Sequence, residues 1–178
     1  MIRLFIGIPL PHDFSTGLIA FQEENKFVQG IKWVPDRNLH VTLCFIGNYA
    51  PDKLAELKKK LSLIASKTNS FQMEFEHFQF GPSFNKAYML WAKFRKNDNF
   101  AKLALKMDED ILKKISKKEP IPHITLCRFK RIEKEEIKLN FPVEINKITV
   151  NQFNLYESLL EQSGAEYRKL HEFKLMNA

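Results

Sequence analysis

The chain contains one short pattern twice, and this repeat constrains the fold more than any other feature. The copies are His40-Val41-Thr42-Leu43 and His123-Ile124-Thr125-Leu126, and each copy continues into a cysteine. The two histidines lie 83 residues apart (123 − 40), which is roughly half of the chain. This spacing indicates equivalent positions in the two halves of a duplicated unit.

Both copies lie in runs of β-branched and aromatic residues, which predict strands. Residues i and i+2 of a strand share a face, so His40 and Thr42 should point together, as should His123 and Thr125. Two imidazoles and two hydroxyls in one cleft would form an acid–base site with donors for an anion. Such a site suits phosphate ester chemistry without a metal.

Composition indicates a folded, basic protein. The chain has 178 residues, of which 44% are hydrophobic, and 16 of them are Phe, so it can bury a core as one domain or two small lobes. Lysine and arginine exceed the acidic residues by 7, and the sequence pI is about 9.3. A basic surface suits a polyanionic partner such as RNA.

We expect a cytoplasmic protein with no membrane association. The apolar opening, residues 1–9, is too short for a secretory signal or a membrane span and is interrupted by Pro9. It therefore predicts a first strand.

The remaining pattern predicts an α+β fold with largely antiparallel sheets. Asp13 should cap the first helix, Gly30 should end it, and a bulge is expected near His77. Two such sheets would face each other across a cleft, with helices outside and with the histidines opposite one another. The expected helices span 13–28, 52–66 and 99–116, and the expected strands span 2–9, 39–46, 71–76, 86–94, a segment from residue 121, 143–156 and 167–175.

A zinc site is the first alternative for the repeated histidines. Cys44 and Cys127 would complete a set of two histidines and two cysteines, and simple alternation places each cysteine on the face of its histidine. However, four residues along an extended strand separate these ligands by about 13 Å, too far for one ion. We therefore expect no metal and two buried thiols. The remaining histidines, His12, His77 and His171, lack a matching context and are interpreted as structural.

Acid–base catalysis fits the repeat better. Imidazole titrates near neutral pH, so one histidine can accept a proton while the other donates one. Thr42 and Thr125 would then donate hydrogen bonds to phosphate oxygens. Arg128 could also bind phosphate. Alternation places Arg128 on the opposite face from His123, so it would reach the site only if the strand ends or bulges there.

These residues resemble those of the 2H phosphoesterases, and within them the RNA 2′,3′-cyclic phosphodiesterases once called 2′-5′ RNA ligases. The resemblance covers nearly the whole chain. It is carried by the opening strand at residues 3–8, by Asn38-Leu39 before His40 and Gly47 after it, by Pro122 before His123 and Arg128 after it, and by a closing segment from residue 155 to 170.

The resemblance implies one domain over residues 1–178, made of two intertwined lobes related by a pseudo-twofold axis. It also implies hydrolysis of RNA 2′,3′-cyclic phosphate ends, such as those of tRNA fragments, to 2′-phosphates, with no cofactor and with the protein a monomer. In this scheme His40 donates a proton, His123 accepts one, and Thr42, Thr125 and Arg128 bind the phosphate. The residues alone do not distinguish the acid from the base.

Four other functions remain open at this point. The same chemistry could act on 2′-5′-linked oligonucleotides or on small cyclic nucleotides, and its reversal would be 2′-5′ RNA ligation. A non-catalytic RNA-binding module would use the basic surface alone, but binding would not require two titrating groups.

Overall fold

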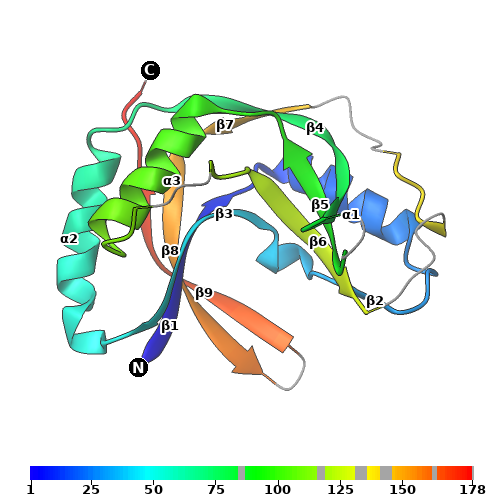
Figure 1. Ribbon diagram of the computed structural model, residues 1–178, viewed down its shortest axis with the longest axis horizontal. Helices are drawn as coiled ribbons and strands as arrows, with labels where there is room; N and C mark the ends of the chain where they lie inside the picture. The colour runs from blue at the N-terminus through cyan, green and yellow to red at the C-terminus, as the bar shows by residue number, and fades with distance from the viewer. Residues whose placement is uncertain (84–86, 116–118, 131–135, 141–145, 162–163, 178) are drawn as a thin grey trace.

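The computed structural model describes residues 1–83, 87–115, 119–130, 136–140, 146–161 and 164–177 (Figure 1). The elements follow one another as β1 (Ile2–Pro9), α1 (His12–Glu24), β2 (Ile31–Trp33), η1 (Asp36–Asn38), β3 (His40–Tyr49), η2 (Pro51–Lys53), α2 (Leu54–Ala65), β4 (Phe71–Gly81), β5 (Met89–Phe94), α3 (Asp98–Asp110), β6 (His123–Phe129), β7 (Lys147–Val150), β8 (Gln152–Glu161) and β9 (Gly164–Lys174).

The strands form an antiparallel sheet in the order β7-β4-β5-β6-β3-β1-β8-β9, with β2 paired to β6. The sheet curls strongly, and the β8–β9 hairpin projects on one side of the opening while β2 and the end of β6 lie on the other (Figure 1). The predicted α+β class with antiparallel strands is confirmed. The two predicted sheets are continuous, because their innermost strands, β3 and β6, pair with each other.

The joint between the two halves is the pair Val41↔Ile124. Both side chains are fully buried. These residues are equivalent in the two motifs, so an antiparallel pair between them generates a local twofold axis. The motif strands therefore meet at the centre of the molecule.

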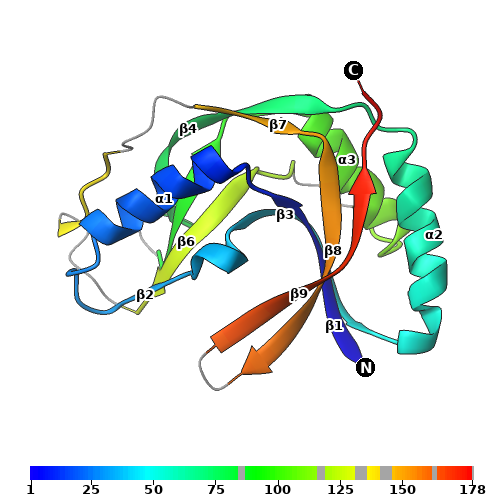
Figure 2. The same cartoon turned by 180° about the vertical axis from the view of Figure 1, so that it is seen from behind.

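The helices cover the face of the sheet that forms the core, and two of them cross to the other half (Figure 2). α1 follows β1, yet its Phe14 and Phe21 rings lie 5.7 Å from Phe94 and 4.1 Å from Phe78. α3 follows β5, yet it packs against β3. Because each half contributes a helix to the other, we propose one domain of two intertwined lobes.

The first helix is shorter than predicted. Asp13 does not cap it: the N-cap is Pro11, which has no side-chain hydrogen bond, and Asp13 lies in the first turn. The helix ends at Glu24 rather than near Gly30, because the buried Asn25 amide donates to the Phe21 carbonyl and accepts from the Lys138 amide. Sequence periodicity could not reveal this long-range bond.

Other boundaries also moved. The third helix ends at Asp110 rather than at the predicted residue 116. The strand predicted over 86–94 begins at Met89. Residues 116 and 86 themselves lie outside the described part of the chain. The strand predicted over 143–156 is divided between β7 and β8, and its residues 143–145 are not described. The predicted bulge near His77 is confirmed by a register shift between Phe75 and His77.

None of the helices in the described ranges is long and apolar enough to cross a membrane.

Candidate active site

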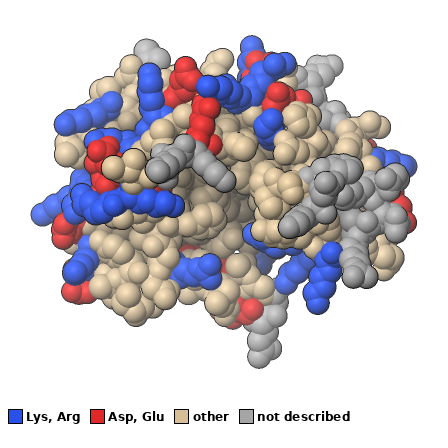
Figure 3. All heavy atoms as spheres, in the orientation of Figure 1, with Lys and Arg blue, Asp and Glu red and all other residues tan. Residues whose placement is uncertain are grey.

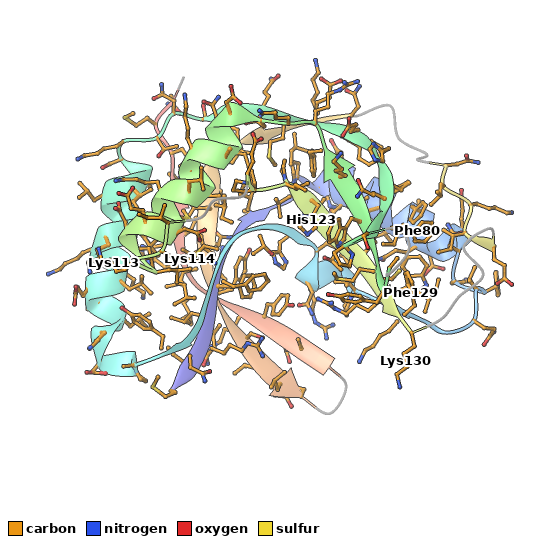
Figure 4. All side chains as sticks on the ribbon, in the orientation of Figure 1. Phe80, Lys113, Lys114, His123, Phe129 and Lys130 are labelled. Carbon is orange, nitrogen blue, oxygen red and sulfur yellow. The ribbon has the colours of Figure 1, made fainter. Side chains whose placement is uncertain are left out.

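The central strand pair places the four motif side chains on one face. Val41 and Ile124 point into the core, so the residues that flank them in β3 and β6 point to the opposite face. These residues are His40, Thr42, His123 and Thr125, and all four are partly exposed. Figure 4 shows His123 at the centre of the molecule, where β6 meets β3. The structure thus brings the predicted residues together.

Backbone hydrogen bonds orient both imidazoles in the same way. The His40 Nδ1 lies 2.7 Å from the Asn38 carbonyl oxygen, and the His123 Nδ1 lies 2.8 Å from the Ile121 carbonyl oxygen. A carbonyl can only accept, so each Nδ1 carries a proton and donates it. In each neutral ring, Nε2 therefore carries a lone pair and no proton. In His40 this atom is 3.0 Å from Thr42 Oγ1, whose hydroxyl can donate to it.

Burial keeps both histidines neutral at pH 7. It lowers the pKa of His40 to about 4, the Asn38 carbonyl raises this pKa, and the positive charge of His123 lowers it further. Burial also lowers the pKa of His123, against the effect of the Ile121 carbonyl. The effect of His123 on the pKa of His40 places the two rings within electrostatic reach. A negative charge bound between them would favour protonation.

Aromatic residues that the motif did not indicate surround the histidines. The His40 ring lies 4.8 Å from Phe5 and 5.4 Å from Tyr167, and the His123 ring lies 4.1 Å from Trp91. These rings exclude water from the imidazoles, which accounts for the lowered pKa values. The sequence did not indicate these aromatic residues, because they lie far from the motifs along the chain. Strands β8, β9 and β5 approach the histidines only through sheet pairing.

Gly7 on β1 is a second residue that the sequence analysis did not assign to the site. A Cβ at this position would lie 2.9 Å from His40 Cδ2 and 3.4 Å from the Val41 carbonyl oxygen. The backbone of β1 therefore supports the imidazole directly. The sequence could have indicated Gly7, because an isolated glycine within a strand pattern often marks a close backbone approach.

A bulge in each motif strand changes the faces of the residues that follow. In β3, Thr42 pairs with Gly7 and Cys44 with Ile6, so Leu43 is an extra residue. The same shift occurs in β6, where Thr125 pairs with Trp91 and Cys127 with Leu90. The prediction that the cysteines share the face of the histidines is wrong, because the bulge turns both thiols into the core.

The same bulges return the next residues to the histidine face. These residues are Phe45 in β3 and Arg128 in β6, equivalent positions of the repeat. Arg128 thus meets the condition under which it could reach the site. Its Nη1 donates to the Met89 sulfur, a weak acceptor, at 2.9 Å. Phe45 is 67% exposed, so the two sides of the site differ in charge.

The cysteines do not form a metal centre with the histidines. Burial raises the pKa of the Cys44 and Cys127 thiols to about 12, and the Asp108 carboxylate further raises that of Cys44. Thiols on the core side of the sheet cannot share an ion with imidazoles on its other face. In the described part of the chain, no group of three His, Cys, Asp or Glu side chains could hold a metal.

Several known proteins are similar to this chain in sequence. Residues 8–91 match the family model described as LigT like Phosphoesterase. An RNA 2′,3′-cyclic phosphodiesterase of Methanocaldococcus jannaschii is 28% identical over 97% of this chain and 100% of its own. Its counterpart in Aquifex aeolicus is 29% identical over 98% of both chains.

Solved structures share the fold. The crystal structure of TT0787 of Thermus thermophilus covers 99% of both chains with a TM-score of 0.83 and 26% identity. E. coli LigT in the apo form covers 98% of both chains with a TM-score of 0.77 and 24% identity. The fold is shared with E. coli LigT, and the paired motifs lie on one face of it. In sequence and in fold, the chain resembles the LigT-like phosphoesterases.

Proposed function

We propose that the protein hydrolyses RNA 2′,3′-cyclic phosphate ends to 2′-phosphates by acid–base catalysis with two histidines and no metal. The observation that carries the proposal is the twofold pair of imidazoles, each with its Nδ1 fixed by a backbone carbonyl. This arrangement leaves two Nε2 atoms for proton transfer on one face. The names of the full-length relatives support the same substrate class.

In the proposed reaction, water attacks the phosphorus while the bond to O3′ breaks. One Nε2 takes a proton from the water, and the protonated Nε2 of the other ring gives its proton to O3′. The product keeps its phosphate on O2′. By resemblance to the family, His40 is the donor and His123 the acceptor.

Without substrate, the neutral imidazoles can accept a proton. The imidazole that donates a proton becomes protonated only when substrate binds. With a pKa of about 4, His40 is neutral at pH 7 in the free protein. The negative charge of a bound cyclic phosphate raises the pKa of a nearby imidazole, so binding itself would supply the proton donor. Thr42, Thr125 and Arg128 would hold the phosphate oxygens and stabilise the added charge of the transition state.

The decisive experiment is an assay with EDTA on a short RNA that ends in a 2′,3′-cyclic phosphate. Wild type, His40→Ala and His123→Ala should be compared, and the product identified as a 2′- or 3′-phosphate. Formation of the 2′-phosphate by wild type alone supports the proposal. Absence of turnover together with salt-dependent RNA binding would leave a binding module.

The same assay separates the remaining alternatives. Faster cleavage of a 2′-5′-linked oligonucleotide would make that linkage the substrate, and incubation with a second RNA that ends in a 5′-hydroxyl would reveal ligation, in which that hydroxyl attacks the phosphorus in place of water and the bond to O3′ breaks. We also propose that the protein acts as a monomer in the cytoplasm on ends such as those of tRNA fragments.

A further inference from the structure

A cationic groove lies at the end of β6, next to the candidate active site. Its volume is about 680 Å³, and it is lined by Gly30, Lys32, Tyr88, Arg128, Phe129 and Lys130. Figure 4 shows Lys130 at the far end of β6 from His123, and Figure 3 shows Lys and Arg side chains gathered at this lower edge of the molecule.

Strand geometry connects the groove to the catalytic face. Arg128 follows the bulge and lies on the face of His123 and Thr125. Lys32 on β2 pairs directly with Arg128, so the two side chains share this face. Lys130 lies two residues beyond Arg128, about 7 Å farther along the strand. The three cations therefore extend from the site toward the molecular edge.

These cations lack anionic partners within the described ranges. None of the three forms an ion pair with a carboxylate there. The acceptor recorded for Arg128 is the Met89 sulfur, which is much weaker than a phosphate oxygen. A groove with unneutralised cations has its strongest complement in a polyanion.

The opposite side of the site carries an aromatic ring where the cationic side carries Arg128. The position equivalent to Arg128 is Phe45, an exposed ring 6.1 Å from Phe5. On the cationic side, the end of the β8–β9 hairpin approaches Lys32: a Cβ at Gly164 would lie 3.4 Å from Lys32 Nζ. The Asn38 amide fixes the hairpin by donating to the Ala165 carbonyl at 2.7 Å. A phosphate chain would thus leave the site along β6.

We propose that this groove binds the nucleotides that precede the terminal cyclic phosphate. Lys32 and Lys130 contact their phosphates, and the half-exposed Tyr88 provides a ring for a base. The enzyme consequently prefers an oligonucleotide to a mononucleotide 2′,3′-cyclic phosphate. This inference rests on the proposed function and specifies which form of its substrate class the site takes.

The test compares kcat/KM for a mononucleotide 2′,3′-cyclic phosphate and for a hexanucleotide with the same end. Wild type should favour the hexanucleotide, and the advantage should fall with salt. The double variant Lys32→Gln/Lys130→Gln should lose about tenfold on the hexanucleotide and little on the mononucleotide. Its log–log salt dependence should flatten by roughly 1.4, about 0.7 for each lost phosphate contact.

The matched control is Lys67→Gln/Lys102→Gln, which removes the same charge from a groove between α2 and α3. Equal loss in the two double variants would show a general charge effect and overturn the inference. Equal efficiency of wild type on both substrates would overturn it as well.

Failure of the proposed function is distinguishable, because neither substrate would then yield product. In that case, fluorescence anisotropy of a labelled hexanucleotide with a 3′-phosphate still tests the groove. Weaker binding by Lys32→Gln/Lys130→Gln than by the control supports it, and unchanged binding overturns it.

Discussion

Val41 and Ile124 occupy the same position in the two copies of the motif, and they pair with each other between β3 and β6. Because a residue pairs with its own equivalent, the twofold axis passes between them. One pair of buried aliphatic side chains thereby fixes the relative positions of both histidines and both threonines. The catalytic face depends on this pair, although neither residue can touch the substrate.

Replacing either histidine with alanine should reduce kcat by about 10² to 10⁴, the usual contribution of a positioned acid or base. The double variant His40→Ala/His123→Ala should lose little more activity than the less active of the two single variants, because the residues act as a unit. Single-turnover measurements with the cyclic phosphate check this. Unfolding curves serve as the control, and fully additive losses would contradict coupled roles.

The free energy of unfolding should depend on the protonation of His40. Its folded pKa of about 4 lies below the ordinary value of 6.5, so the unfolded chain binds more protons between these values. Stability should therefore fall as the pH falls from 6.5 to 4. The contribution between pH 7 and pH 5 is about 2 kcal/mol.

Urea unfolding at both pH values, for wild type and His40→Gln, measures this term. The variant should lose less stability on acidification, since glutamine does not titrate. An identical pH dependence of the two proteins would show that His40 is not buried in its neutral form. Titration of the ring by NMR provides an independent check.

Gly7→Ala should impair catalysis by displacing His40. The new Cβ would meet His40 Cδ2 at 2.9 Å, so the ring must shift from its bond to Asn38. Misplacement on the scale of 1 Å can reduce the rate on the order of 10²-fold. We expect the loss in kcat rather than in KM, together with a changed His40 pKa.

Gly7→Ala should reduce kcat by more than its loss of folding stability alone would explain. A control is Ala92→Gly at a buried strand position of the other half. This substitution removes a Cβ atom, whereas Gly7→Ala adds one. If both variants lose stability but only Gly7→Ala loses activity, the positioning role is supported. Normal kcat in Gly7→Ala would contradict it.

Arg128→Lys should not restore the function of the arginine. A guanidinium can bind two phosphate oxygens at once, whereas an ammonium acts as a point charge. We expect Arg128→Lys and Arg128→Met both to lose at least about tenfold in kcat/KM. Steady-state kinetics on the mononucleotide cyclic phosphate, which lacks upstream phosphates, isolate this effect. Full activity of Arg128→Met would place the residue outside the reaction.

Replacing both cysteines with alanine should leave the reaction intact. The thiols point into the core, and their raised pKa values of about 12 keep them protonated. Activity of Cys44→Ala/Cys127→Ala should match wild type with and without EDTA, apart from some loss of stability. Slow alkylation of the folded wild type by iodoacetamide is a further check. Loss of activity in the presence of EDTA would instead indicate a metal site.

Much of this arrangement could be predicted from sequence, because the motif repeat determines both the fold's symmetry and the shared face of His40, Thr42, His123 and Thr125. Alternation failed after Thr42 and Thr125, since these two bulges, unlike the one near His77, leave no break in the sequence pattern. Thus the cysteines were assigned to the wrong face. The aromatic surroundings, such as Trp91 and Tyr167, depend on strand pairing across the whole chain and could not be read locally.

The difference between Phe45 and Arg128 has a consequence for regiochemistry. Two identical half-sites would accept a cyclic phosphate in two orientations related by the axis, with O2′ and O3′ exchanged between the imidazoles. Product would then carry its phosphate on either oxygen. If the proposed reaction holds, an apolar ring on one side and a guanidinium on the other would remove this degeneracy. The position five residues after each histidine, rather than the histidines themselves, would then determine which oxygen keeps the phosphate.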